Sequence, residues 1–235
     1  MLVIGNKKVI CITLARGGSK SIPLKNITPL CGRPMLEYTL DEVKKSKYID
    51  YYIVSTDHKD IMDVCKKNDV NIHNRPPHLA LDTSKSADCL IDILKKFNNK
   101  YDYVVEVMVT NPLKTVEDID TCIERLHITG ADTVVSVVRV FDHHPARIKY
   151  INGDQLCDFY PESLESRRQD LMPWAYVRNG SVYALTVEAL YSRRAKVGYD
   201  CRPYIMPQER SINVDEEMDL MIAELMLNEQ QKPNI

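Results

Sequence analysis

Apolar, β-branched runs alternate with helical patterns through the first 140 residues of the chain. The first run, residues 9–14, is almost wholly apolar, as expected of a strand that is buried on both faces of a parallel sheet. The helical patterns repeat apolar residues every three or four positions, as in Leu36, Leu40 and Val43. Further strands are expected at residues 51–55, 103–109, 133–140 and 181–185. This order predicts a Rossmann-like α/β fold with a doubly wound, mostly parallel sheet.

The regular alternation stops near residue 141. Residues 141–175 mix histidines, arginines and aromatic residues, with short strand-like pieces around Asn152-Gly153. This segment is too polar and irregular to complete the sheet, so we expect a small protruding lobe that forms an oligomer contact. The last helical pattern repeats apolar residues on one face, at Met218, Met221, Ile222 and Leu225. We expect a single domain, residues 1–235, with a dimerisation lobe within about 141–175.

The charge balance argues against several classes of protein. The chain has 235 residues, with 31 Lys and Arg against 33 Asp and Glu, and a formal net charge of −2. No overall attraction to nucleic acid or to an anionic membrane follows from this charge. No apolar run approaches the roughly 18–20 residues of a membrane helix. Seven cysteines without a C-x-x-C pair disfavour a zinc site or a secreted disulfide framework. The N-terminal sequence reaches Lys7 and Lys8 without an apolar signal core, so we expect a cytoplasmic protein.

A cationic, glycine-containing loop follows the first strand directly. Gly17 and Gly18 allow the backbone to approach a ligand closely, and Arg16, Lys20 and Lys25 add three positive charges within ten residues. Neither a Walker A motif nor G-x-G-x-x-G occurs here. Ligands gather at the carboxyl ends of strands in such sheets. The loop therefore predicts a polyphosphate site at this edge of the sheet.

The full loop, A-R-G-G-S-K-S-I-P-L-K-N at residues 15–26, resembles the signature of the acylneuraminate cytidylyltransferases, which share a Rossmann-like nucleotidyltransferase fold. Seven further motifs agree with this family in order and spacing along nearly the whole chain. They are V-S-T-D at 54–57, R-P-P-H-L-A-L-D-T-S at 75–84, T-N-P-L-K at 110–114, H-H-P at 143–145, R-Q-D-L at 168–171, N-G-S-V-Y at 179–183 and S-I-N-V-D at 211–215. The resemblance implies transfer of CMP from CTP to a nine-carbon acidic keto sugar of the sialic or legionaminic acid type, with release of pyrophosphate.

The resemblance also assigns roles to individual residues. The triphosphate-binding and catalytic set would be Arg16, Ser19, Lys20, Lys25 and Asp215. Cytosine and ribose would be read by Asn26, Arg75, Ser84 and Ser86. The sugar site would contain Met108, Arg168, Arg178, Asn179 and Tyr183, with Arg147 reaching the pocket of the other subunit of a homodimer.

Two departures from the family pattern affect these roles. Met108 stands where the family commonly has a glutamine that contacts the substrate, and methionine cannot make the hydrogen bonds of an amide. Asn213 and Asp215 stand where the family has two aspartates that bind the metal. Asparagine still offers a carbonyl oxygen, so Mg²⁺ or Mn²⁺ remains the expected cofactor, with one negative charge fewer around it.

Simpler interpretations stay open for several residues. Arg75 could be a surface arginine, Ser84 could cap the following helix, and Asp215 could cap the last helix. His143-His144 suggests a metal, but neighbouring residues on an extended strand point to opposite faces. The alternative activities are a CMP-Kdo or CMP-pseudaminate synthetase, and a catalytically silent nucleotide-binding subunit.

Overall fold

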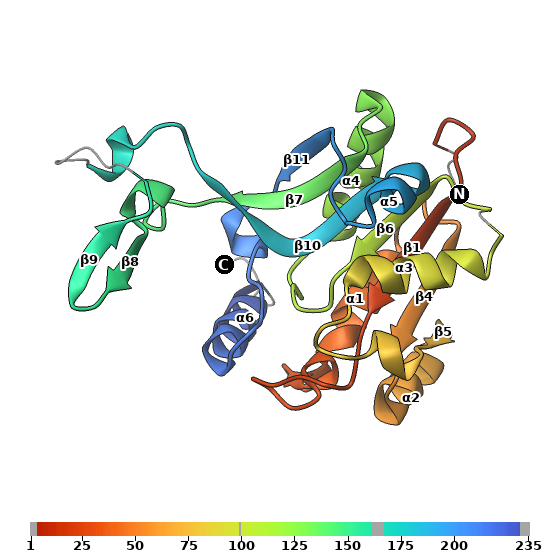
Figure 1. Ribbon diagram of the computed structural model, residues 1–235. Coiled ribbons are helices and arrows are strands. Elements are labelled where there is room, and N and C mark those ends of the chain that lie inside the picture. Colours follow the sequence, from red (N-terminus) through yellow and green to blue (C-terminus); the bar gives the residue numbers. More distant parts are fainter. Residues whose placement is uncertain (1–3, 99, 161–166, 231–235) are drawn as a thin grey trace.

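The computed structural model describes residues 4–98, 100–160 and 167–230. Its centre is a seven-stranded sheet in the order β11-β7-β10-β6-β1-β4-β5. The strands are β1 (Val9–Leu14), β4 (Tyr51–Thr56), β5 (Asn71–Asn74), β6 (Tyr103–Val107), β7 (Thr133–Arg139), β10 (Tyr176–Thr186) and β11 (Cys201–Ile205). β10 runs antiparallel to both of its neighbours, and the other pairs are parallel. The predicted mostly parallel α/β sheet is confirmed (Figure 1).

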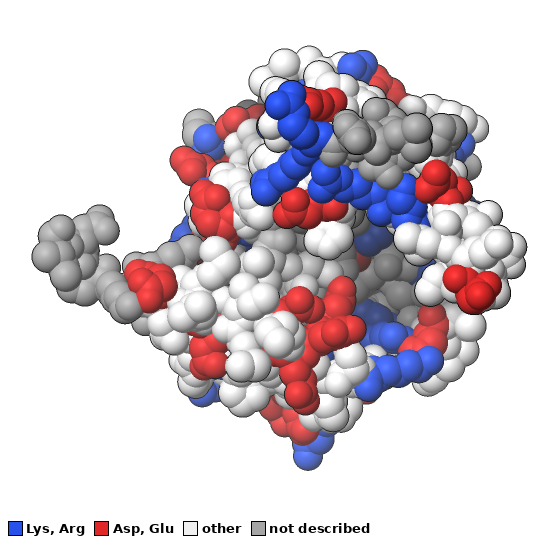
Figure 2. All heavy atoms as spheres, turned by 90° about the vertical axis from the view of Figure 1, so that its left-hand side faces the viewer, with Lys and Arg blue, Asp and Glu red and all other residues white. Residues whose placement is uncertain are grey.

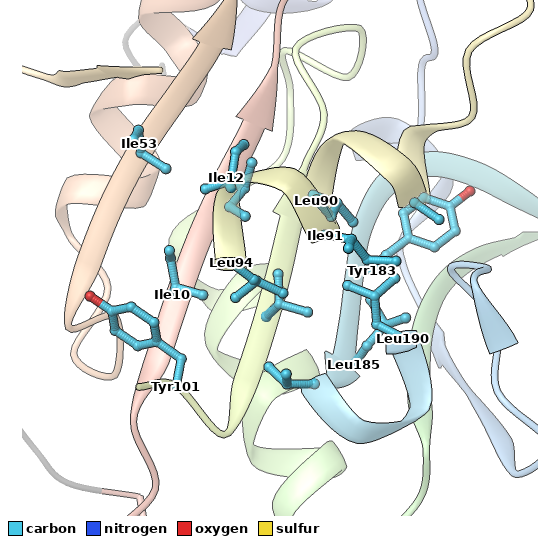
Figure 3. Packing of buried hydrophobic residues seen from close by; sticks show 14 of the residues in the cluster. Ile10, Ile12, Ile53, Leu90, Ile91, Leu94, Tyr101, Tyr183, Leu185 and Leu190 are labelled. Carbon is cyan, nitrogen blue, oxygen red and sulfur yellow. The ribbon is translucent and has the colours of Figure 1, made fainter. Parts of the chain in front are cut away.

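Helices cover both faces of this sheet. α3 (Ser86–Lys95) and α5 (Val187–Arg193) pack on one face, where Ile10 and Ile12 of β1 meet Leu90 and Leu94 of α3 (Figure 3). The other face is covered by α1 (Met35–Lys44), α2 (Lys59–Lys67) and α4 (Val116–Thr129). Successive side chains of a strand point to opposite faces. A strand that is apolar throughout is therefore the sequence signature of this two-faced burial.

The described residues of the segment 141–175, which are 141–160 and 167–175, extend away from the sheet at the far ends of β7 and β10 (Figure 1). It contains the hairpin of β8 (Lys149–Asn152) and β9 (Gln155–Asp158), whose turn uses Gly153 at a φ of +67°. Two short 3-10 turns flank the hairpin, η3 (Pro145–Arg147) and η4 (Arg168–Asp170). We call this segment the lobe.

Smaller elements complete the fold. A two-stranded ribbon joins β2 (Pro29–Leu30) to β3 (Arg33–Pro34). The remaining 3-10 turns are η1 (Lys25–Ile27), η2 (Pro77–Leu79) and η5 (Gln208–Arg210). In the part of the chain that the structure describes, no helix combines the length and the hydropathy that crossing a membrane requires.

The final helix, α6 (Glu217–Gln230), is confirmed, but its buried face is not the predicted one. Ala223 and Leu227 are buried, whereas the side chains of the predicted stripe are largely exposed, with Met218 and Met221 each at 63%. Two apolar stripes of helical spacing exist on this helix, and periodicity does not say which of them faces the core. α6 contacts β2, and Ala223 and Leu227 belong to the same buried cluster as Leu30 of β2, so this stripe is the one that faces the core.

Candidate active site

A cavity of about 740 Å³ opens at the carboxyl ends of β1 and β6 and beside β10. Its lining includes ten of the residues that the sequence assigned to the site: Arg16, Ser19, Lys20, Lys25, Asn26, Met108, Arg178, Tyr183, Asn213 and Asp215. On the face of the molecule that carries the lobe, Lys and Arg side chains gather around a hollow in the surface (Figure 2). The residues assigned to the site therefore gather at the carboxyl edge of the sheet, where ligands bind in folds of this kind.

The loop after β1 holds its shape through its own contacts. The Gly17 amide donates a hydrogen bond to Asp57 Oδ1 (2.9 Å), and Asn26 Nδ2 donates to the carbonyl oxygen of Arg16 (2.9 Å). A Cβ at Gly17 would lie 2.7 Å from Cβ of His58, so a side chain does not fit there. Asn26 is buried and thereby fixes the loop from beneath. The sequence assigned Asn26 to nucleotide reading, and these contacts add a structural role.

Each of the three predicted phosphate-binding cations is paired with a carboxylate. Arg16 and Lys20 both bind Asp82, at 2.7 and 2.8 Å, and Lys25 Nζ lies 2.8 Å from Asp215 Oδ1. Hydrogen bonds from Lys20 and Arg16 lower the pKa of the Asp82 carboxyl. An entering triphosphate would have to take these cations from their carboxylate partners. Asp82 was part of a motif in the sequence, but this pairing was not predicted.

A second cavity, of about 210 Å³, adjoins the first and shares Leu14, Arg16 and Met108 with it. Arg75, Ser84 and Ser86 line it, so the three residues assigned to cytosine and ribose lie together. Ser84 Oγ donates to the carbonyl oxygen of His78 (2.8 Å), and α3 begins at Ser86 after Lys85, so Ser84 does not cap that helix.

Arg75 is not a surface arginine. Its side chain is buried, and the guanidinium donates to Ser55 Oγ (3.1 Å) and to the Ser55 carbonyl oxygen (2.8 Å) at the end of β4. Burial lowers the pKa of the Arg75 guanidinium from its ordinary value. Because two of its donors are held by the sheet, the remaining donors have a fixed direction toward the second cavity.

An irregularity in β10 shapes the opposite wall of the main cavity. The pairing of β10 with β7 shifts between Arg178 and Tyr183, and both residues line the cavity. Gly180, at a φ of +62°, is required there, since a Cβ would come within 2.9 Å of Asn213 Oδ1. β-bulges re-aim side chains in this way at functional sites.

Asn179 lies in the same irregular stretch but faces the protein interior. Its Oδ1 accepts from Ser136 Oγ (2.7 Å), and its Nδ2 donates to Ser211 Oγ (2.9 Å). The side chain is buried and does not line either cavity. It ties β10 to β7 and to the segment before Asn213, so a contact between Asn179 and the sugar stays a prediction.

The donor set at the C-terminal motif fits a hard divalent cation that is held mainly by phosphate oxygens. Asp215 supplies the one carboxylate in the described lining of the main cavity, and Asn213 donates from Nδ2 to Asp215 Oδ2 (2.5 Å). Described residues contain no cluster of three or more His, Cys, Asp or Glu that could hold a metal by themselves. Mg²⁺ is commonly held by one or two carboxylates together with substrate phosphates.

The capping interpretation of Asp215 is wrong. Near the start of α6 the acceptor is Asp219 Oδ2, which takes hydrogen bonds from the amides of Asp215 and Glu216, both at 2.9 Å. The Asp215 side chain points instead toward Lys25.

The lobe keeps two predicted sugar ligands away from the main cavity of their own chain. Arg168 lines a separate cavity of about 290 Å³ with Asp142, and its guanidinium stacks 4.7 Å from the ring centroid of Phe141. Arg147 lies in η3 and lines neither of the two cavities described above. His144 Nε2 lies 3.0 Å from the carbonyl oxygen of Pro173.

Two residues, one in each cavity, were missed in the sequence. Lys196, in the loop between α5 and β11, lines the main cavity, and its Nζ lies 2.8 Å from Oε2 of Glu106, which lines the second cavity. No motif surrounds Lys196. A signal did exist for Glu106, because a lone carboxylate inside the apolar run of β6 has to be paired or functional.

A third residue, which belongs to the T-N-P-L-K motif but was given no role from the sequence, lies just beneath the site. Lys114 is 2% exposed, and its Nζ contacts Thr39 Oγ1 (2.8 Å) and the carbonyl oxygens of Met108 (2.8 Å) and Asn111 (2.6 Å). Burial lowers the pKa of Lys114 to about 7. The side chain holds together the loop that carries Met108.

The chain can be compared with known proteins once this geometry is established. A family model described as "Cytidylyltransferase" matches residues 10–218. The "N-acylneuraminate cytidylyltransferase B" of Danio rerio is 31% identical over 226 residues, which cover 94% of this chain and 51% of that protein. The "N-acylneuraminate cytidylyltransferase" of Streptococcus agalactiae serotype V is 30% identical over 217 residues, covering 91% and 52%. The chain thus spans about half the length of these curated relatives.

Solved structures show the same fold. A CMP:2-keto-3-deoxy-manno-octonic acid synthetase complexed with CTP superposes with a TM-score of 0.70 at 16% identity, covering 95% of this chain and 99% of the other. The 4-diphosphocytidyl-2C-methyl-D-erythritol synthase of Anaerococcus prevotii gives 0.67 at 18% identity, covering 96% and 98%. At these identities the likeness concerns the fold alone.

Proposed function

The chain belongs to the cytidylyltransferase family, and from this premise we propose that it transfers CMP from CTP to the anomeric hydroxyl of a nine-carbon acidic keto sugar of the sialic or legionaminic acid type. The observation that carries the proposal is the junction of two cavities at Leu14, Arg16 and Met108. One cavity contains the cationic loop and the other contains the buried Arg75. A nucleoside triphosphate that spans the junction would place its α-phosphorus beside the space left for an acceptor. The curated relatives named above support the choice of acceptor.

In the proposed reaction the anomeric oxygen forms a bond to the α-phosphorus, and the bond from that phosphorus to the bridging oxygen breaks. Pyrophosphate leaves with the bridging oxygen, and the hydroxyl proton passes to solvent water. Arg16, Lys20 and Lys25 would exchange their carboxylate partners for phosphate oxygens and stabilise the charge of the departing group. Positioning and charge neutralisation supply the catalysis, because phosphoryl transfer needs little covalent work from the protein.

The acceptor carboxylate needs a cation on the wall opposite the loop. Arg178 lines this wall and is exposed, and no ion pair joins it to another residue in the described ranges. A bound carboxylate would meet a guanidinium that is not already neutralised. We therefore assign the carboxylate to Arg178, with Tyr183 beside it.

Asp215, supported by Asn213, would hold Mg²⁺ or Mn²⁺ together with the triphosphate. When bound, this ion neutralises phosphate charge and polarises the phosphoryl oxygens. Lys25 would then be released from Asp215 to contact the nucleotide.

We also propose that the protein works as a homodimer. The lobe exposes apolar side chains such as Ile151, Leu156 and Trp174, and α6 exposes Met218 and Met221. Aromatic and apolar groups at this density are typical of an interface. Arg147 would then be supplied to the partner's acceptor site.

Sedimentation tests this assembly. We expect a dimer at micromolar concentration that Leu156→Lys converts to monomer with reduced activity. Ile128→Lys is the matched control, because Ile128 is equally apolar and 80% exposed but lies on α4, away from the lobe. A parent protein that is monomeric and fully active would contradict the dimer.

Pyrophosphate release tests the reaction itself. CTP should be used in preference to UTP, ATP and GTP, because a site that hydrogen-bonds particular base edges leaves buried polar groups unpaired with the wrong base. Sialic and legionaminic acids should be turned over faster than Kdo or pseudaminic acid. Equal turnover with UTP would contradict the assignment of Arg75, Ser84 and Ser86. CTP binding without turnover of any keto acid would instead indicate a silent nucleotide-binding subunit.

A further inference from the structure

A buried ion pair lies between the main cavity and the second cavity, on the wall away from the phosphate-binding loop. Glu106, on β6, is 1% exposed, and its Oε2 lies 2.8 Å from Lys196 Nζ. The Lys196 side chain is 20% exposed and lines the main cavity. A carboxylate in the middle of a central strand is costly to bury unless a cation is always beside it. Glu106 therefore fixes Lys196 at this point of the wall.

The ion pair with Glu106 uses only part of the hydrogen-bonding capacity of the Lys196 ammonium. Glu106 Oε2 is a strong acceptor that lies 2.8 Å from Lys196 Nζ and engages one of its donors. The other near neighbours are Met108 Sδ at 4.0 Å, which is a weak acceptor, and the Tyr183 ring, whose centroid lies 4.1 Å away. An ammonium has three N–H donors, and buried donors are normally satisfied. The arrangement thus leaves donors that a ligand in the cavity can use.

The charge of Lys196 tells which ligand group fits. Glu106 already neutralises Lys196, whereas Arg178 on the same cavity has no ion-pair partner within the described ranges. A carboxylate gains more from the guanidinium that is not neutralised, and a neutral oxygen gains a hydrogen bond from the ammonium without bringing in a further charge. Met108 and the face of Tyr183 supply an apolar surround for such a group.

We propose that Lys196, held in place by Glu106, is a specificity-determining residue that donates a hydrogen bond to an uncharged oxygen, an acyl carbonyl or a hydroxyl, on the acceptor sugar. The proposal rests on the proposed function, since it assigns a role within the acceptor half of that site. Met108 cannot donate or accept as an amide would, and Lys196 provides the donor on this side of the cavity.

The test is steady-state kinetics of Lys196→Met with the full chain, CTP, Mg²⁺ and the best acceptor of the panel. We expect the KM for the acceptor to rise about tenfold or more, in line with the loss of a hydrogen bond to a charged donor, while the KM for CTP changes less than about twofold. Removal of Lys196 alone leaves the Glu106 carboxylate buried without its cation. Glu106→Gln/Lys196→Met is therefore measured as well, and we expect it to keep the parent melting temperature more closely but not to recover the acceptor KM.

Arg194→Met is the matched control, because Arg194 is a cation two residues away that pairs with Asp88 outside the main cavity. Acceptor analogues identify the contacted oxygen. Each analogue lacks either the N-acyl carbonyl or one of the hydroxyl groups. With the correct analogue, Lys196→Met should cause no further loss.

An acceptor KM unchanged in the double variant would show a purely structural pair and overturn the proposal. An equal loss with every analogue would assign Lys196 to the carboxylate and overturn it too. If the parent turns over no keto acid at all, the proposed function fails, and this inference fails with it. If the parent turns over a keto acid and the variants have the same acceptor KM as the parent, only the role of Lys196 is contradicted, and the proposed function stands.

Discussion

The two ends of the main cavity hold their cations in different ways. We call the end with Arg16, Lys20 and Lys25 the phosphate end, and the end with Lys196 the acceptor end. At the phosphate end, Arg16, Lys20 and Lys25 are paired with carboxylates that are themselves exposed, at 49% for Asp82 and 62% for Asp215. At the acceptor end, Lys196 is paired with Glu106, whose carboxylate is 1% exposed. Exposed pairs contribute little stability and exchange readily, whereas a buried carboxylate cannot lose its partner without a large cost.

This difference matches what the proposed function requires of each end. In that proposal the phosphate end gives up its internal ion pairs when a triphosphate enters, and its loop is one continuous segment held by Asn26 and Gly17. Under the same proposal the acceptor end would keep its ion pair throughout the reaction and present a fixed donor. Its residues come from β6, β10 and the loop before β11. We expect substitutions at the phosphate end to change the local charge and the salt dependence of the protein. Substitutions at the acceptor end should change the rigidity of the cavity wall and the choice of acceptor.

The largest effect is expected at Asp215, at the phosphate end. Asp215→Ala should lower kcat/KM by at least about 10²-fold, equivalent to about 2.7 kcal/mol of transition-state stabilisation, because it removes the one carboxylate in the described lining of the main cavity, to which we assign the metal. Asn213→Asp should retain activity and lower the Mg²⁺ concentration needed for half-maximal rate, because it places a second carboxylate beside the first. Magnesium titrations of the three proteins measure both.

If Asp215→Ala titrates with magnesium as the parent does, the metal assignment is wrong. Loss of activity in Asn213→Asp would mean that the amide of Asn213, which donates to Asp215, is itself required.

A smaller effect is expected at Lys114, beneath the acceptor end. Burial lowers its pKa to about 7, below the value of an unfolded lysine, so the unfolded chain binds more protons between these two values. Stability from this group therefore rises with pH above about 7. Relative to Lys114→Met, the parent should gain on the order of 2–3 kcal/mol in free energy of unfolding between pH 7 and pH 9.

Urea unfolding at both pH values measures this difference. The neutral amine would donate to the carbonyls of Met108 and Asn111 and accept from Thr39. A difference between the two proteins that does not change with pH would mean that Lys114 keeps its proton when buried.

The smallest effect is expected at Asp82. Asp82→Asn should increase the affinity for CTP by about two- to fivefold, because the triphosphate no longer competes with this carboxylate for Arg16 and Lys20. The gain should be largest at low ionic strength, where exposed charges are least screened. Calorimetric titration at two salt concentrations measures it, with Asp63→Asn as control, since Asp63 pairs with Lys66 on α2. Weaker binding in Asp82→Asn would show that this side chain helps to hold the nucleotide.

Much of the phosphate end was predictable because its residues are close in sequence. The loop from Arg16 to Asn26 brings its own glycines and cations, and the strand before it was readable as apolar. The resemblance assigned Arg75 to the nucleotide without predicting its burial, and the structure excluded the surface alternative. Lys196 was not predictable, since its partner Glu106 lies 90 positions earlier and only strand order brings them together.

The sequence by itself determined the α/β class and the cationic, glycine-containing character of the loop after β1, because these depend on local periodicity and on residues that are close together in the chain. The tertiary structure alone decided which stripe of α6 is buried, that Arg168 lies in a cavity of its own, and that Asn179 faces the interior. It also decided which cations are held by exposed and which by buried carboxylates. These outcomes depend on which distant segments pack together. A helical or strand pattern fixes the spacing of its own residues but does not determine which other residues they contact.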